Sequence, residues 1–109
     1  MTVKELSQST GFSALALPCP DRSINGVYIG DLLSWVMGRA SEDNAWITIM
    51  SNTNVIAVAT LTDVSCIILS EGVTLENDVL ATAEAKGINV LCSEASAYET
   101  ARALMTLGL

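Results

Sequence analysis

The chain has 109 residues, of which 50% are hydrophobic and only 16% are charged, so it is too apolar to be disordered and long enough for one domain with a buried core. Its net charge of −7 disfavours binding to nucleic acid and to anionic membranes, because the five cations are scattered along the sequence. So few charges leave apolar side chains on the surface of a small domain, and we therefore expect a homodimer.

The predicted elements alternate between helical patterns and short apolar runs. A capping box, Thr2 with Glu5, begins the first helix, and Gly11 stops it. A second capping box, Ser96 with Glu99, begins the last helix, and Gly87 ends the one before it. We expect helices at 2–9, 31–39, 54–61, 74–86 and from 96 onward, and strands at 13–17, 27–29, 45–50, 66–69 and 88–92.

This rhythm of apolar strands and intervening helices predicts βαβ units. The expected fold class is α/β: a single domain over residues 1–109, layered, with a mostly parallel sheet and helices packed on its faces.

The start of the chain, Met1–Glu5, lacks the basic residues and apolar core of a signal peptide, and no apolar run approaches the roughly 20 residues of a membrane span. We expect a cytoplasmic location. The three cysteines have no C-x-x-C spacing, so neither a zinc site nor a disulfide framework is expected. Cys66 and Cys92 lie in apolar runs and should be buried thiols, whereas Cys19, between two prolines, is more exposed and could have a redox role.

Several kinds of catalytic site are missing from the sequence. The chain contains no histidine, which excludes Ser-His-Asp and Cys-His catalysis. Neither lysine follows a glycine, so there is no P-loop, and Gly26 and Gly30 flank a strand instead of forming a dinucleotide-binding turn. The sequence therefore predicts no enzyme and no cofactor, and a carboxylate-bound divalent metal is the one enzymatic alternative.

A candidate ligand site comes from topology, because ligands of open parallel sheets bind outside the carboxyl ends of the strands. The polar residues expected there are Ser51, Asn52, Thr53, Asn54 and Ser93. Residues 51–54 precede a helix, so they could hold an anion through backbone N–H groups, or they could simply cap that helix. Three carboxylates on the same rim, Asp31, Glu71 and Glu94, oppose an anion.

One segment resembles a known family. Asp21-Arg22, Gly26 and Gly30-Asp31-Leu32-Leu33, followed by 45–49, 54–59 and 67–72, are similar to the DRTGG domain, a small regulatory module. Such modules resemble the non-catalytic N-terminal domain of HPr kinase/phosphorylase and occur beside CBS pairs in regulated pyrophosphatases. The name-giving motif departs from the family here, since Asn25 stands where a glycine is expected.

The resemblance implies a stand-alone regulatory module, dimeric and without catalytic residues to transfer. The leading hypothesis is a non-enzymatic module that self-associates and docks on a protein partner; the alternative is a sensor that binds an anionic or nucleotide ligand at the rim. Asp21 and Arg22 either pin a turn or, through Arg22, contact an anion or partner. Gly26 and Gly30 are expected to permit a positive φ or a close backbone approach.

Overall fold

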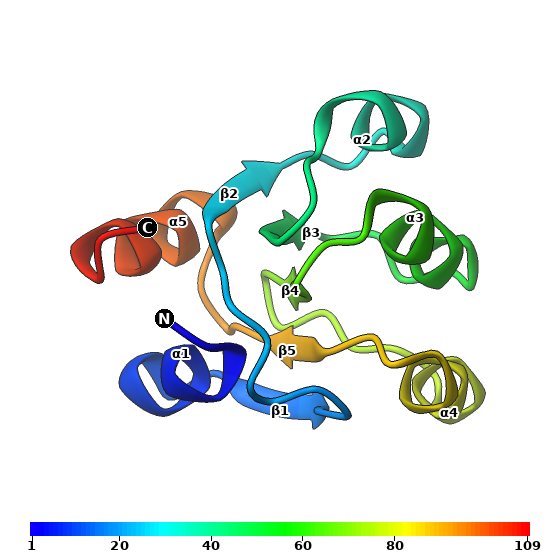
Figure 1. The fold of residues 1–109 in the computed structure, drawn as a ribbon, viewed down its shortest axis with the longest axis horizontal. Helices are drawn as coiled ribbons and strands as arrows, with labels where there is room; N and C mark the ends of the chain where they lie inside the picture. Colours follow the sequence, from blue (N-terminus) through cyan, green and yellow to red (C-terminus); the bar gives the residue numbers. More distant parts are fainter.

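The computed structural model describes all 109 residues and shows a five-stranded sheet between two layers of helices (Figure 1). The strands follow the order β1-β5-β4-β3-β2, and only β1 runs antiparallel to its neighbour. The strands are β1 (Ser13–Ala16), β2 (Gly26–Ile29), β3 (Asn44–Thr48), β4 (Cys66–Leu69) and β5 (Val90–Cys92). The helices are α1 (Val3–Thr10), α2 (Leu33–Arg39), α3 (Asn54–Thr62), α4 (Asn77–Lys86) and α5 (Ala97–Thr106). The predicted α/β class with a mostly parallel sheet is confirmed.

The sheet separates two apolar cores. Side chains alternate along each strand, so Trp46 and Ile67 face one layer and Ile47 and Ile68 face the other. The larger core lies under α2, α3 and α4, and the smaller one under α1 and α5. Because β4 is buried on both faces, its run of four apolar residues shows no alternation in the sequence.

The helix ends agree with the predicted capping at several places. The Thr2 hydroxyl and the Glu5 carboxylate exchange hydrogen bonds with each other's backbone N–H groups, which completes the predicted capping box of α1. The second predicted capping box is only half formed: the Ser96 hydroxyl accepts the N–H of Glu99 at the start of α5, but the Glu99 carboxylate bonds to Arg102 and not to the Ser96 N–H. Gly11 and Gly87 both have a positive φ and end α1 and α4.

Helix α2 begins later than its sequence predicts. Asp31 was expected to open it, but α2 starts at Leu33 without a side-chain cap. The Asp31 carboxylate instead accepts hydrogen bonds from the Thr48 hydroxyl and the Ile49 N–H. It therefore fastens the turn after β2 to the end of β3, a role that depends on strand pairing and not on local sequence.

No helix of this fold combines the length and the apolar character that crossing a membrane requires.

Candidate functional site

The connection from β1 to β2, residues 17–25, crosses the whole sheet. It starts at one edge strand and ends at the other, so it passes the amino ends of β5, β4 and β3 (Figure 1). We call this segment the strap. Its carbonyl groups also accept the first N–H groups of α1, since Val3 donates to Arg22 and Lys4 donates to Pro20.

Two side chains hold the strap against the amino ends of β5 and β4 by hydrogen bonds. The Asn89 amide, buried just before β5, accepts the Cys19 N–H at 2.9 Å and donates to the Cys19 carbonyl at 2.8 Å. The Ser65 hydroxyl, just before β4, donates to the carbonyls of Ser23 and Asp43. The strap thus replaces the hydrogen bonds that the amino ends of these strands would otherwise make with water.

Arg22 is the centre of the strap. Its guanidinium donates to Asp43 Oδ1 at 3.0 and 3.1 Å, to Asp63 Oδ1 at 2.8 Å and to the Asp63 carbonyl at 2.6 Å. Partial burial by itself would lower the pKa of Arg22, but the hydrogen bonds to Asp63 and Asp43 outweigh this effect and raise it. Arg22 therefore holds the α2–β3 and α3–β4 loops together at the amino end of the sheet.

The two aspartates that bind Arg22 both have an uncommon, left-handed backbone conformation. Asp43 has φ 65° and Asp63 has φ 57°, a region that Asp tolerates better than most residues. Asp21, by contrast, is exposed and makes no side-chain hydrogen bond. Two roles were predicted for the Asp21-Arg22 pair, and the geometry favours the one in which Arg22 stabilises a turn. Its partners are Asp43 and Asp63 in place of Asp21.

The family-motif residues divide between opposite ends of β2. Asp21, Arg22 and Gly26 lie at the amino end, whereas Gly30 and Asp31 lie at the carboxyl end. Neither glycine has a positive φ. A Cβ on Gly30 would lie 2.9 Å from the Tyr28 ring, so the absence of a side chain at Gly30 makes room for a neighbouring ring and not, as was expected, for a backbone segment. A Cβ on Gly26 would be 3.3 Å from Asn44 Nδ2.

Residues 51–54 lie on the carboxyl-end rim, at the start of α3. All four are exposed, and one side chain contributes a cap: Asn52 Oδ1 accepts the N–H of Asn54 at 3.0 Å. Thr53, the N-cap residue, makes no side-chain bond to the helix. This segment is the most accessible polar part of the rim.

Ser93 lies on the same rim but faces α5. It is 2% exposed, and its hydroxyl is hydrogen-bonded to Thr100 and accepts the N–H of Ala95. Residues 51–54 follow β3 and Ser93 follows β5, and β4 lies between these two strands, which are therefore two strand spacings, about 10 Å, apart. The neighbouring Ser70 hydroxyl is buried and has no hydrogen-bond partner.

The remainder of the rim is acidic, and its backbone includes residues with positive φ and a glycine without room for a side chain. Glu71 has φ 60° and donates its N–H to the Ala95 carbonyl, and Gly72 has φ 68°. A Cβ on Gly72 would lie 2.6 Å from Glu94 Oε2. The three expected carboxylates, Asp31, Glu71 and Glu94, thus occur in the loops that follow β2, β4 and β5.

The buried cysteines behave as their sequence context predicts. Cys66 and Cys92 are buried and Cys19 is half-buried, and all three are free thiols. Burial raises the pKa of Cys66 to about 12. Burial and, secondarily, the nearby Glu94 raise the pKa of Cys92. A raised pKa disfavours the thiolate, which is the reactive form of cysteine.

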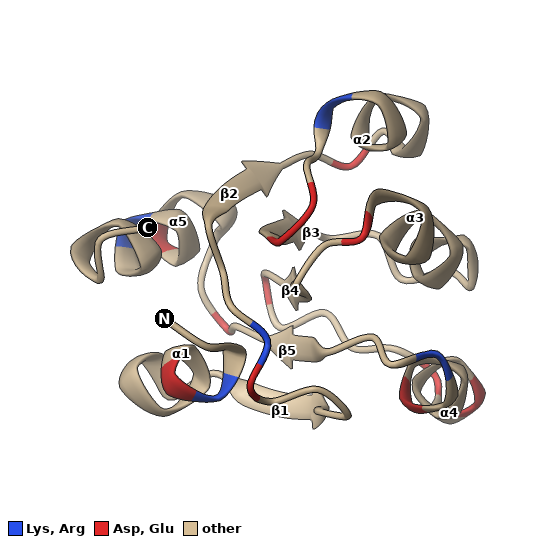
Figure 2. Cartoon of the chain, in the orientation of Figure 1, with Lys and Arg blue, Asp and Glu red and all other residues tan.

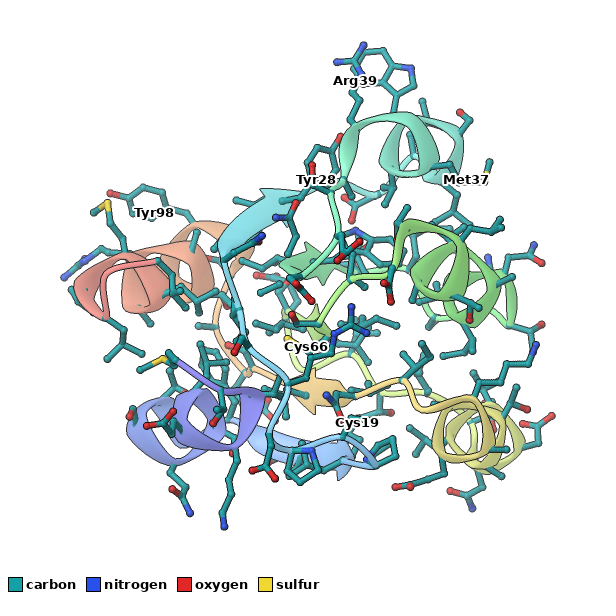
Figure 3. All side chains as sticks on the ribbon, in the orientation of Figure 1. Cys19, Tyr28, Met37, Arg39, Cys66 and Tyr98 are labelled. Atoms are coloured by element: carbon teal, nitrogen blue, oxygen red, sulfur yellow. The ribbon has the colours of Figure 1, made fainter.

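An exposed apolar surface on α2 was not expected from the sequence. The Arg39 guanidinium stacks on the exposed Trp35 ring, 3.9 Å from its centroid, and Arg39 points away from the sheet (Figure 3). Leu32, three residues before Trp35, is also exposed, and Met37 is exposed on another side of α2. The four-residue spacing of Trp35 and Arg39 in a helix was the available signal. On α5, Tyr98, Ala101 and Met105 line a shallow hollow of about 280 Å³ together with Arg102 and Thr106.

Comparison with known proteins places this geometry in a family. A model of the DRTGG domain matches residues 21–107, from the strap to the end of α5. The chain belongs to the DRTGG domain family. Within this family's motif, Arg22 is the residue that closes the amino end of the sheet.

The DRTGG fold of this chain also resembles a solved structure. It superimposes on the crystal structure of the CBS and DRTGG domains of the regulatory region of Clostridium perfringens pyrophosphatase, complexed with the activator diadenosine tetraphosphate, with a TM-score of 0.72 and 15% sequence identity. The match covers 93% of this chain and 44% of that chain. At this identity the likeness concerns the fold. Curated protein sequences contain no significant match.

Proposed function

We propose that this DRTGG domain is a non-enzymatic regulatory module that self-associates and docks on a protein partner. The observation that carries the proposal is the exposed surface on α2 that consists of Leu32, Trp35 and Arg39. Trp and Arg are enriched at protein interfaces and among binding hot spots. The free thiols suit a reducing compartment such as the cytoplasm.

Docking is tested with the proteins encoded beside this chain in its genome, because a regulatory module is commonly encoded near its target. We expect one of them to bind in calorimetry and Trp35→Ala to weaken that binding about 30-fold, the equivalent of about 2 kcal/mol. Leu61→Ala is the matched control, since Leu61 is the most exposed large apolar side chain and lies on α3. Equal binding by wild type and Trp35→Ala would contradict docking through α2.

Self-association is tested by light scattering at micromolar concentration. We expect twice the chain mass of 11.5 kDa. A monomer at these concentrations would refute this part of the proposal.

The alternative function is a sensor of an anionic or nucleotide ligand at the carboxyl-end rim. Two observations support it: the structurally similar pyrophosphatase region is complexed with a nucleotide activator, and residues 51–54 expose polar groups at the start of α3. Ser93 is the further candidate residue, although its hydroxyl is already bonded to Thr100. The acidic rim opposes this function.

A thermal-shift screen over nucleotides and phosphorylated metabolites separates the two functions. A ligand at 100 times its Kd should stabilise the domain by about 2.7 kcal/mol. Asn52→Ala should reduce that shift, because Asn52 orders the loop before α3. If no compound raises the Tm, the sensor function fails in this form.

A further inference from the structure

The two edge strands of the sheet differ in how they are protected. The register of β1 is interrupted between Ala14 and Ala16, and Pro18 and Pro20 follow the strand. Bulges and prolines are the usual devices that prevent an edge strand from pairing with another chain. Strand β2 pairs with β3 in continuous register and contains neither proline nor charge. Its outer edge is therefore open to a further strand.

The backbone of β2 has groups available for such pairing. Gly30 donates its N–H to the Ile47 carbonyl of β3. Since N–H groups alternate in direction along a strand, those of Val27 and Ile29 point away from β3. These outward groups have no strand partner within the chain.

Exposed apolar side chains occur on β2, just after its neighbour β3, and on α5. Ile29 is 50% exposed and lies opposite Ile47 on the face that carries α5. Ile49, which follows β3, and Tyr98, on α5, are also largely exposed. Tyr98 projects from α5 on the side away from α1 (Figure 3). This set, Ile29, Ile49 and Tyr98, is separate from the α2 surface and is called the β2-edge patch below.

The charge around the β2 edge favours an identical chain as the occupant. The elements that flank the edge, β2, α2 and α5 with the turn at Asp31, carry two carboxylates and two cations that sum to zero: Asp31, Glu99, Arg39 and Arg102. The loop after α2 adds Asp43, which is paired with Arg22, and the exposed Glu42, so most of the net charge of −7 resides on the rest of the chain (Figure 2). Two acidic copies repel each other elsewhere and can approach closely here.

We propose that a second copy of this chain occupies the β2 edge, related by a two-fold axis that sets the two β2 strands antiparallel. The two sheets then join into one, and the β2-edge patch of each copy packs against that of the other. A two-fold contact requires a self-complementary surface, and a neutral apolar patch beside an unpaired strand meets this requirement. The proposal rests on the self-association proposed above and specifies the surface that carries it.

The test compares three chains by sedimentation equilibrium over a dilution series: wild type, Ile29→Lys and Leu61→Lys. Ile29→Lys places a charge in the centre of the contact, and lysine on an edge strand is compatible with folding. Leu61→Lys makes the same change at a side chain that is 74% exposed on α3. We expect wild type and Leu61→Lys to dimerise alike and Ile29→Lys to raise the dimer Kd at least tenfold.

The outcomes distinguish the two levels of the proposal. A monomeric wild type would refute self-association itself. A dimeric wild type with an unchanged Kd in Ile29→Lys would refute only the β2 edge as the contact, as would an equal loss in Leu61→Lys. Amide hydrogen exchange of the wild type supplies a measurement that needs no variant: the N–H groups of Val27 and Ile29 should be protected at high concentration and exchange faster on dilution. Concentration-independent exchange in a sample that dimerises would also overturn the proposal.

Discussion

At the amino ends of β3, β4 and β5, the polar groups bond to one another through the strap, whereas at the carboxyl ends residues 51–54 expose theirs. The ends also differ in charge. The amino end pairs Arg22 with two carboxylates, and the carboxyl-end rim carries three carboxylates in its loops without a cation paired to any of them. The comparison teaches that Arg22 of the family motif ties the loops of the amino end together, whereas at the carboxyl end Asp31 of the same motif fastens one turn and residues 51–54 stay exposed.

Removing Arg22 should have the largest effect on stability. Arg22→Met leaves Asp43 and Asp63 without their cation and should lower the free energy of unfolding by about 2–4 kcal/mol, measured by urea denaturation. Arg102→Met is the control, because its bond to Glu99 is exposed, and it should cost less than about 0.5 kcal/mol. If the two variants are equally stable, the strap does not close the amino end as described.

The next effect is expected at Gly30, beside the carboxyl end of β2. Gly30→Ala introduces a Cβ 2.9 Å from the Tyr28 ring and should cost about 1–3 kcal/mol in thermal or urea unfolding. Gly38→Ala makes the same change within α2, where no atom lies within 4 Å, and should stabilise the domain by about 0.5–1 kcal/mol. Opposite signs for the two variants are the expected result, and a neutral Gly30→Ala would show that the ring has room to move.

The closed amino end should also appear in the pH dependence of stability. The pKa of Cys66, the first residue of β4, is raised by burial from its ordinary value of 9.0 to about 12. Between these values the unfolded chain releases a proton that the folded chain keeps, so stability is fully present below pH 9 and falls as the pH rises toward 12. At pH 10 the loss amounts to about 1 kcal/mol.

Urea unfolding of wild type and Cys66→Ala at pH 8 and pH 10 measures this contribution. The difference between the two pH values should be smaller in Cys66→Ala by that amount, whatever the absolute stability of the variant. An identical pH dependence in both chains would show that Cys66 titrates normally and that the amino end admits water.

The smallest effects are expected at residues 51–54. Asn52→Ala removes the one side-chain cap of α3 and should cost about 0.5–1 kcal/mol, whereas Thr53→Ala removes a hydroxyl that makes no helix bond and should cost almost nothing. Equal losses would indicate that Thr53 also caps the helix in solution. In either case the loss of stability should stay below that of Arg22→Met, because residues 51–54 are exposed to solvent.

Much of the fold could be predicted because the signals are local. The hydrophobic periodicity, the apolar runs and the capping residues located ten elements within a few residues of their observed bounds. Strand β4 matches its predicted range, 66–69, at both ends. Boundaries failed where a distant partner decided them. Asp31 has the composition of a helix start, but its carboxylate binds the end of β3, so α2 begins two residues later than expected.

The candidate site was less accessible to sequence analysis. The motif residues were identified, but their partners were not, since Asp43 and Asp63 are 21 and 41 positions away from Arg22. The rule for parallel sheets predicted polar residues outside the carboxyl ends of the strands, and residues 51–54 and Ser93 do follow β3 and β5, but β4 lies between these two strands. Exposure of Trp35 was likewise not predictable, because an apolar residue in a short helix is usually packed.

The sequence by itself determined the class of the fold, the family, and the chemistry that the chain lacks, because these depend on composition, spacing and local hydrogen bonding. Only the tertiary structure decided that the strap connects the two edges of the sheet and that β2 becomes an unprotected edge. Strand order depends on which elements pack together across the whole chain, and so on the summed burial of side chains far apart in sequence. No local pattern in the sequence contains the strand order. It is the strand order that makes the strap cross the amino end of the sheet and leaves β2 as an open edge.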